Sequence, residues 1–452
     1  MDPIPSGEVV ELLVALIRNA CVNDGTPDSG GETRSCDTLI GYLGEPDRVF
    51  EPHPGRRSIL YRVPGRVPGA PAVMLLGHTD VVPARADTWS VDPFAGERAD
   101  GFVWGRGAVD MLDQTAAMAA VAKRFREGSV PPLPGDLLFL AVADEEAAGH
   151  LGAGWITRHH WDEVRCGYLI TEIAAPALGG GSAPGIPVTV AEKGPMWRRL
   201  RAAGVSGHGS QPHGSRNALV PVADAVRRLA ESPPPAEITL EWRRFVEAWD
   251  PPAPLAASLL DPDRIDAAVD ELALDDPGFA RWVHACTHLT ISPNTLYGGV
   301  KANVVPDLAV AEVDVRVLPG QDEASVLDHM RKAIGPRLAE EVAIEAMVAA
   351  PAGSSPPEGP LWKAIGAAAG SVAGEGVRLL PTLIPVATDA RFFRERGTIA
   401  YGVGAFDERV GFGDFLSMFH GDDERVSEVS LGMTARLYAE TLERLGESLG
   451  GG

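Results

Sequence analysis

A strand-like apolar run that ends in a histidine and an acid constrains the fold of this chain more than any other stretch. Residues 73–76 predict a buried strand, and Gly77 lets the backbone turn sharply before His78 and Asp80. Open α/β sheets bind ligands at the C-terminal ends of their strands. Because residues two apart on an extended path point the same way, His78 is placed to bind a metal while Asp80 fixes its free ring nitrogen. A hydrogen-bonded structural histidine is the alternative interpretation.

Carboxylates follow other predicted strands in the same way. The strand predicted at 137–143 ends in three consecutive acids, 144–146, and the strand predicted at 168–171 ends in Glu172. Asp110 leaves a glycine-rich turn at the start of a predicted helix. Strands that alternate with helices form a mostly parallel sheet, whose C-terminal edge would gather these groups in one crevice. A helix cap at Asp110 and a solvated acidic turn at 144–146 are the alternatives.

A second histidine, His420, follows a short apolar stretch just before the last predicted helix, at 426–445. Two histidines and three or four carboxylates suit a pair of borderline divalent ions, with one carboxylate bridging and one acting as general base. This combination is much more specific than any of its members.

The composition limits the classes to which the chain can belong. With 452 residues, of which 45% are hydrophobic, the chain is long enough for two or three domains. The 62 acidic residues against 40 basic ones give a net charge of −22, which argues against a nucleic-acid surface. No stretch resembles a standard secretion signal or a membrane span, and the four cysteines lack a CxxC pair. We therefore expect a soluble, reduced, cytoplasmic protein, with a Cys21–Cys36 disulfide as the alternative.

Six groups of residues, in order along nearly the whole chain, carry a family resemblance. They are Gly77-His78-Thr79-Asp80-Val81-Val82-Pro83, Gly105-Arg106-Gly107-Ala108-Val109-Asp110-Met111, Asp144-Glu145-Glu146, Gly207-His208-Gly209-Ser210-Gln211-Pro212, Asn303-Val304-Val305-Pro306 with Asp314-Val315-Arg316, and His420 with Glu424. The chain resembles the two-zinc metallohydrolase family of aminoacylase, acetylornithine deacetylase, succinyl-diaminopimelate desuccinylase and glutamate carboxypeptidase. The resemblance implies an α/β fold: a zinc-exopeptidase-like three-layer catalytic domain with a mostly parallel central sheet, plus an inserted α/β lid.

The resemblance also divides the chain into domains. Residues 1–195 and 351–452 would form the catalytic domain, and 196–350 the lid through which two chains would form a homodimer. Residues 232–286 within the lid range are rich in Pro and Asp but contain several aromatic residues, so we expect short helices that shape specificity or cover the dimer edge. The glycine-rich loop at 178–187 is expected to be a linker or rim.

The resemblance implies two divalent ions per chain, zinc first, with cobalt or manganese as alternatives. Asp110 would bridge the two ions. His78 and Glu172 would complete one site, and Glu146 and His420 the other. In many relatives Lys-Gly-Gly follows the bridging motif, whereas this chain has the sequence Leu-Asp-Gln at 112–114, so any role of that lysine is absent.

Three further residues receive catalytic roles from the resemblance. Glu145 would be the general base and acid, and Asp80 would orient His78. His208 would reach the partner protomer's active site and donate a hydrogen bond to the developing oxyanion, although an ordinary surface histidine is the alternative.

Substrate-binding roles follow in the same way. Arg316 would bind the α-carboxylate of the substrate with its planar fork, or else be an ordinary exposed strand arginine. Asn303 would lie near the substrate carbonyl, or else simply end a turn. Arg391 belongs to a Thr-Asp-Ala-Arg stretch that resembles a loop lining the substrate site of the family.

The expected function is a zinc-dependent hydrolase that cleaves an amide or peptide bond next to a free carboxylate. Its substrate would be a small acyl-amino acid or a short peptide, with no nucleic-acid or membrane partner. Glu172, where dipeptidases tend to have Asp, favours N-acyl-amino acids. A two-metal aminopeptidase and a metal-bearing but non-catalytic binding protein are the alternatives. Glu145 argues against the second, because a protein without catalysis has no need of a free carboxylate beside the metals.

Overall fold

Strand β3 (Val73–His78) lies near the middle of a nine-stranded sheet and explains the layered architecture around it. The computed structural model describes residues 4–179 and 184–450. Val73 and Leu75 pack into one hydrophobic core, whereas Met74 and Leu76 pack into a second core on the opposite face of the sheet. Because neighbouring strand residues point to opposite faces, a continuous apolar run requires cover on both sides. The result is a three-layer unit, here called the base.

The base sheet runs in the order β1, β2, β6, β3, β7, β18, β8, β16, with β17 also paired to β8. The bounds are β1 Arg48–Phe50, β2 Ser58–Val63, β6 Leu137–Val142, β7 Tyr168–Thr171, β18 Ile399–Gly402, β8 Gly185–Glu192, β16 Gly353–Ser354 and β17 Arg378–Ile384. The pairs β6–β3, β3–β7, β7–β18 and β8–β17 are parallel, and the remaining pairs are antiparallel. The predicted α/β class is confirmed, although parallel pairing is confined to part of the sheet.

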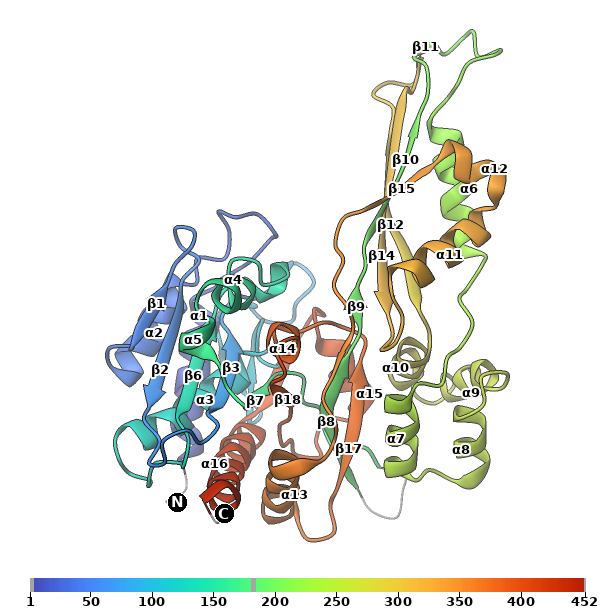
Figure 1. Ribbon diagram of the computed structural model, residues 1–452. Coiled ribbons are helices and arrows are strands. Elements are labelled where there is room, and N and C mark those ends of the chain that lie inside the picture. The colour runs from blue at the N-terminus through green and yellow to red at the C-terminus, as the bar shows by residue number, and fades with distance from the viewer. Residues whose placement is uncertain (1–3, 180–183, 451–452) are drawn as a thin grey trace.

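Helices cover both faces of this sheet (Figure 1). One core contains residues of α1 (Ser6–Arg18), α2 (Thr33–Leu43), α3 (Leu112–Arg126), α13 (Gly359–Ala373) and α16 (Glu428–Gly450). The other contains residues of α4 (Ala153–His159), α5 (Trp161–Val164) and α14 (Ala390–Arg394). A small sheet of β4 (Glu97–Ala99), β5 (Phe102–Trp104) and β19 (Arg425–Ser427) brings the segment after His420 beside the segment before Asp110.

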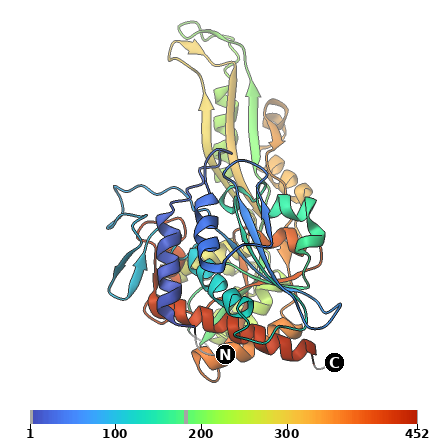
Figure 2. The ribbon, with the colours of Figure 1, turned by 90° about the vertical axis from the view of Figure 1, so that its left-hand side faces the viewer.

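A narrower unit, the lid, projects from the base (Figures 1 and 2). Its five-stranded sheet consists of β12 (Thr290–Gly298), β14 (Leu308–Val317), β10 (Arg198–Ala203) and β15 (Ala343–Ala346), with β9 (Gly194–Pro195) paired to β14. Alternate residues of β14 are buried against α6 (Leu219–Ala230) and α11 (Glu323–Ile334), next to α12 (Pro336–Glu341). At the far tip, β11 (Gly207–His208) pairs with β13 (Val304–Val305). The lid thus has its own core, covered by helices on one face.

Four helices lie between the two halves of the lid in sequence but pack on the base. They are α7 (Leu240–Trp249), α8 (Ala253–Leu259), α9 (Ile265–Leu272) and α10 (Pro277–Thr287), here called the inserted helices. Their aromatic residues Trp242, Phe245 and Trp282 belong to the base core, and Trp282 lies 5.7 Å from Phe412 between ring centroids. The range 196–350 expected for the lid therefore includes helices that belong to the base core.

Several local expectations differ from the structure. Gly77 lies inside β3 instead of ending it, and a Cβ there would lie 2.4 Å from Thr115 Oγ1, so the helix behind the strand explains the glycine. Of the loop expected at 178–187, residues 180–183 lie outside the described part, and β8 already begins at Gly185.

All four cysteine thiols are free. Within the described residues, no helix combines the length and the apolar character needed to cross a bilayer.

Candidate metal centre

The predicted ligands gather at one edge of the base sheet, as expected from strand ends. His78 is the last residue of β3, and Glu172 directly follows β7. Glu145 and Glu146 lie in a single 3-10 turn, Glu145–Ala147, after β6. Asp110 precedes α3, while the fifth ligand, His420, follows α15 (Phe412–Met418).

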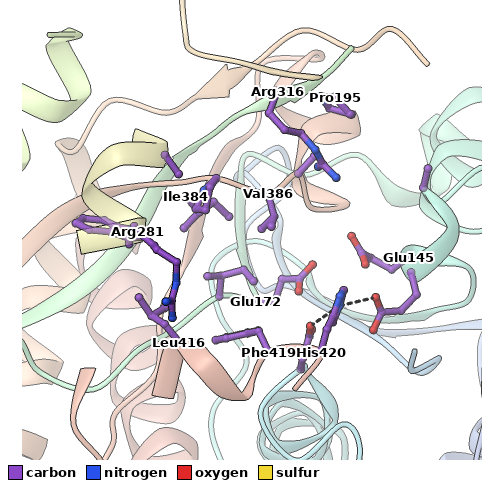
Figure 3. Close-up of a pocket in the computed structure, with 18 of the residues that line it drawn as sticks. Glu145, Glu172, Pro195, Arg281, Arg316, Ile384, Val386, Leu416, Phe419 and His420 are labelled. Atoms are coloured by element: carbon purple, nitrogen blue, oxygen red, sulfur yellow. Dashed lines mark ion pairs between the residues drawn. The ribbon is translucent and has the colours of Figure 1, made fainter. Parts of the chain in front are cut away.

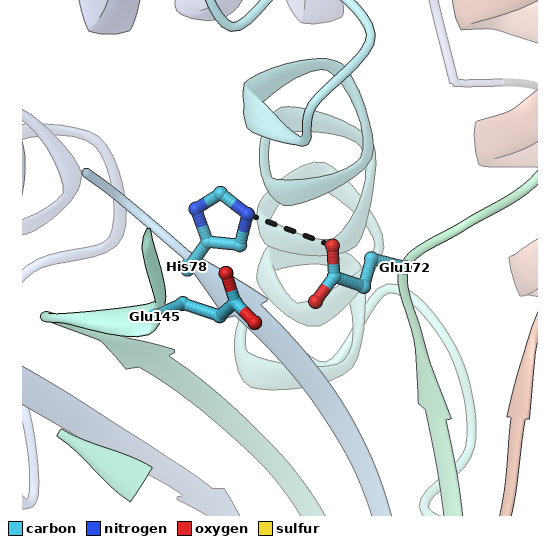
Figure 4. Close-up of side chains that lie close together, drawn as sticks. All are labelled: His78, Glu145 and Glu172. Carbon is cyan, nitrogen blue, oxygen red and sulfur yellow. Dashed lines mark ion pairs between the residues drawn. The ribbon is translucent and has the colours of Figure 1, made fainter. Parts of the chain in front are cut away.

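Asp110 lies between the two histidines and presents a different oxygen to each. His78 Nε2 is 3.3 Å from Asp110 Oδ1 and 3.6 Å from Glu172 Oε2. His420 Nε2 is 3.4 Å from Asp110 Oδ2 and 3.2 Å from Glu146 Oε2. Two triads, each of one histidine and two carboxylates, therefore share Asp110, which is the arrangement that a bridging carboxylate requires. Figure 3 shows His420 with its ion pairs, and Figure 4 shows the ion pair of His78 with Glu172.

These donors suit divalent ions of the zinc type. Imidazole nitrogens with carboxylate oxygens are typical ligands of borderline divalent metals. Ligand atoms of His78, Asp110 and Glu146 all lie within 4.8 Å of one another, and so do those of His78, Glu145 and Glu172. In the described part of the chain, the buried Oε1 atom of Glu146 has no hydrogen-bond partner. The residues present thus fit a two-ion centre, but distance alone also permits Glu145 as a ligand.

Burial and mutual repulsion act on the carboxylates at this edge. Burial, and then the nearby Glu172 carboxylate, raise the pKa of Glu145 well above its ordinary value. Burial, and then Asp110, raise the pKa of Glu146 to about 7. The pKa of Asp110 is lowered, because hydrogen bonds from His420 and His78 outweigh the opposing effect of burial. Bound cations would stabilise all of these carboxylates in their charged form.

Access to solvent differs between the two histidines. The His78 side chain is 1% exposed, whereas the His420 side chain is 57% exposed. Hydrogen bonds to Asp110 and then Glu146 raise the pKa of His420 to about 10. The His420 side of the centre is therefore the side open to incoming molecules.

Asp80 supports the centre in a way that the spacing did not predict. His78 Nδ1 lies 2.9 Å from the backbone carbonyl oxygen of Asp80 and 3.7 Å from its carboxylate. The carboxylate instead accepts hydrogen bonds from the backbone N–H groups of Glu145 and Glu146, at 3.3 and 3.1 Å, and from Asn23 Nδ2 at 2.8 Å. Asp80 thus positions His78 through its backbone and the two glutamates through its side chain.

Asp144, the first of the three consecutive acids, has a structural role. Its backbone adopts the left-handed conformation with φ 72°, and its carboxylate accepts from the backbone N–H of Leu151 at 2.7 Å and pairs with the buried Arg56. Arg56 also lies 3.2 Å from the buried Glu32. The acidic run is therefore divided: one acid holds the turn, and the next two face the site.

Glu424 is a second supporting residue, on the opposite side of Asp110. Its buried carboxylate accepts from the backbone N–H groups of Gly107, Val109 and Asp110 at 2.9, 2.7 and 3.0 Å. Arg106 Nη1 donates to it at 2.9 Å. Since these bonds hold the loop that ends in Asp110, Glu424 positions the predicted bridging carboxylate through the backbone of its loop.

A cavity of about 500 Å³ opens beside the centre and is lined by residues of both base and lid. Its lining includes Glu145, Trp197, Arg281, Trp282, Arg316, Ile384, Val386, Arg391 and Leu416. Figure 3 shows Arg316 extending into the cavity from the side opposite His420. The guanidinium of Arg316 donates to Asp314 of the same strand, from Nε at 2.7 Å and from Nη2 at 3.1 Å, and lies 5.5 Å from the Trp197 ring. One edge of its fork is thus occupied and the other faces the cavity.

The structure does not bring every predicted site residue to this cavity. His208 and Asn303 lie at the tip of the lid, where the exposed His208 ring is 2.7 Å from Ser210 Oγ and the Asn303 carbonyl accepts from Gly209. Arg391 lines the cavity, but its guanidinium donates to the backbone carbonyls of Thr388 and Ala148. Arg281, on the inserted helix α10, lines the cavity although no motif in the sequence indicated it.

Comparisons with known proteins bear on the family and the fold of the chain. The sequence model of peptidase family M20/M25/M40 matches residues 74–444. Succinyl-diaminopimelate desuccinylase of Paracoccus denitrificans is 31% identical over 52% of this chain, but the match spans only 58% of that protein. Aminoacylase-1 of Sus scrofa is 26% identical over 93% of this chain and 91% of its own length. An M20 family metallo-carboxypeptidase from Sulfolobus solfataricus has the same fold, with a TM-score of 0.71 at 16% identity, over 97% of this chain and 99% of its own.

Proposed function

The chain belongs to peptidase family M20/M25/M40 and is a metal-dependent hydrolase, and we propose that it hydrolyses an amide bond next to a free carboxylate in a small N-acyl-amino acid or short peptide. The observation that carries this proposal is Asp110, whose two oxygens face two different histidines. The carboxylate of Glu145, beside them, is the proposed general base.

The residues divide the work of the proposed reaction. Asp110, His78, Glu172, Glu146 and His420 would hold two divalent ions, zinc being the first choice for this donor set. When bound, such ions polarise a carbonyl group and lower the pKa of the attacking water. Glu145 takes the proton from that water and returns it to the leaving amine, a role for which its carboxylate lies close enough to the proposed ligands His78 and Glu172.

The substrate is anchored at its free carboxylate. Arg316 reaches the cavity with the edge of its guanidinium that Asp314 leaves free, so it would bind the carboxylate through Nη1 and Nη2. The names of the relatives, desuccinylase and aminoacylase, support an acyl-amino acid as substrate. Glu172 in place of Asp favours the same choice.

The proposal includes a cytoplasmic homodimer. Since His208 and Asn303 lie at the lid tip and do not line the cavity of their own chain, they would serve the site of the neighbouring chain. His208 would donate to the oxyanion there, and Asn303 would lie near the substrate carbonyl. Arg391 would act indirectly, by bracing the loops around Thr388 and Ala148.

Metal content and a substrate panel test the proposal. Gently purified protein should contain about two divalent ions per chain, and chelation should abolish the hydrolysis of N-acetyl, N-succinyl, N-carbamoyl and dipeptide substrates. Added zinc, cobalt or manganese should restore it. A metal-free preparation with full activity would contradict the two-ion site. Turnover that depends on a free substrate amine, and not on a free carboxylate, would indicate an aminopeptidase instead.

A further inference from the structure

The cavity has a second arginine, Arg281, to which the proposed reaction gives no role. It lies on α10, one of the inserted helices, and its side chain is exposed in the cavity wall together with Trp282 and Leu416. Figure 3 shows Arg281 on a different wall from Arg316, with Ile384 and Val386 between them in this view. Arg281 and Arg316 thus reach the cavity from different units of the molecule, the base and the lid.

Arg281 differs from the other arginines of the cavity in lacking a partner. Arg316 pairs with Asp314, and Arg391 donates to two backbone carbonyls. Among the described residues, none forms a hydrogen bond, ion pair or ring contact with the Arg281 guanidinium. In a chain with 62 acidic and 40 basic residues, partners for a surface arginine are plentiful, so a free guanidinium in the cavity wall is available to a ligand.

The helix that carries Arg281 is held firmly at its first turn. The Asp276 side chain caps it by accepting from Phe279 N at 2.9 Å. A Cβ on Gly278 would lie 2.8 Å from the Gly413 carbonyl oxygen, so the helix start packs closely against α15. Phe279 adds an edge-on contact to Phe412, with ring centroids 5.8 Å apart. These contacts fix the start of α10 beside the segment that leads to His420.

The end of α10 is held by a buried lysine. Lys193 Nζ donates to the backbone carbonyls of Ala285 and His288, at 3.0 and 2.7 Å, and to Thr290 Oγ1 at 3.0 Å. Cys286 Sγ donates to the Leu383 carbonyl of β17 at 3.1 Å. Because both ends of α10 are anchored, Arg281 stands at a defined place relative to the metal centre, as a specificity residue must.

We propose that Arg281 binds a second carboxylate of the substrate, so that the preferred substrate is a dicarboxylic N-acyl-amino acid. The proposal rests on the proposed function, in which Arg316 takes the α-carboxylate. Ile384, Leu416 and Trp282 line the cavity near Arg281 and offer apolar surface to the carbon chain that separates the two carboxylates. The second carboxylate belongs either to the amino-acid side chain or to the acyl group, and both share this chemistry.

Two pairs of substrates test the proposal with the zinc-loaded full-length protein. The first pair, N-acetyl-L-glutamate and N-acetyl-L-glutamine, differs by one carboxylate in the amino-acid side chain. The second pair, N-succinyl-L-leucine and its ω-carboxamide, differs by one carboxylate in the acyl group. In at least one pair the anion should have the higher kcat/KM, by roughly 10- to 100-fold, as expected for a hydrogen-bonded charge pair. The pair that discriminates identifies the position of the second carboxylate.

Variants link that preference to Arg281. Arg281→Gln should lower kcat/KM for the anionic substrate to the value for its amide, and kcat/KM for the amide should stay the same. Arg281→Lys should retain part of the preference for the anion. Arg243→Gln, which removes another exposed arginine from the inserted helices, should behave as wild type. Equal rates within both pairs in wild type, or a preference that survives Arg281→Gln, would overturn the proposal.

Binding measurements separate this inference from the proposed function. Calorimetry on zinc-loaded Glu145→Gln protein should show tighter binding of the same anion, and Arg281→Gln in that background should remove the difference. If no compound is hydrolysed but the anion still binds more tightly through Arg281, the proposed function fails and the Arg281 site stands. Hydrolysis of N-acetyl-L-methionine without any anionic preference in binding or turnover would support the proposed function and overturn the Arg281 site.

Discussion

The metal edge of the base and the tip of the lid are built in opposite ways. At the edge, Asp80 and Glu424 hold the ligand-bearing loops through five backbone N–H groups, and both side chains are fully buried. At the tip, β11 and β13 have only two residues each, and β11 carries His208 in an exposed position. Groups proposed to bind two ions must be held in place beforehand, whereas a group proposed to serve a neighbouring chain must be exposed in its own.

The largest effect expected at the edge is that of Glu145→Gln. If Glu145 transfers the proton and binds no ion, kcat should fall by roughly 10²–10⁴ while two ions stay bound. Steady-state kinetics and elemental analysis measure the two quantities, and Glu271→Gln, an exposed change on α9, is the control. Glu145 lies within ligand distance of His78 and Glu172, so loss of one ion from the Glu145→Gln protein would instead identify Glu145 as a metal ligand.

Mixed dimers test whether the tip acts on the neighbouring chain. Glu145→Gln and His208→Ala homodimers should each be nearly inactive. When the two are mixed under exchange, about half of the dimers are mixed, and each of these has one site with both residues intact, so activity should recover to roughly a quarter of wild type.

The proposed role of His208 in the neighbouring chain is wrong if the mixture remains inactive although native mass spectrometry detects the mixed dimer. In that case His208 acts within its own chain or does not act in the reaction. Single His208→Ala protein with wild-type activity would lead to the same conclusion. Ser210, whose hydroxyl lies next to the ring, offers the control variant Ser210→Ala, for which we expect a smaller change.

The smallest of these effects on activity is expected at Arg316, which lies on β14 of the lid sheet. Arg316→Lys should lower kcat/KM by roughly 10- to 100-fold, because lysine lacks the planar fork and the loss is about 1.5–3 kcal/mol. Arg199→Lys, an arginine of the same sheet that pairs with Glu312, is the control. A substrate and its α-carboxamide analogue that react equally fast in wild type would remove Arg316 from the site.

The sequence predicted that the proposed ligands meet at one edge, because strand ends are local features. The bounds of β7 match the predicted strand, and apolar runs followed by His78, Glu146 and Glu172 meet at one edge because parallel strands end together. Such patterns depend only on neighbouring residues and on the geometry of a sheet.

The hydrogen bonds of Asp80 and Glu424 could not be predicted from the sequence, because their partners are backbone groups far away along the chain. Glu424 binds N–H groups more than 300 positions before it, and Asp80 binds those of the turn at 145–146. Nothing in the residue types indicates such bonds. The placement of the inserted helices was missed for a similar reason: amphipathic helices show which face is buried but not which core receives it.

The inserted helices also bear on how the lid is attached. The chain passes between base and lid four times, at 192–194, 231–239, 287–290 and 347–352, where a simple insertion would cross twice. The two shortest crossings meet at Lys193, whose ammonium group joins the end of α10 to the start of β12. Because Lys193 lies in the first crossing and binds residues on both sides of the third, the position of the lid on the base depends on these two connections together.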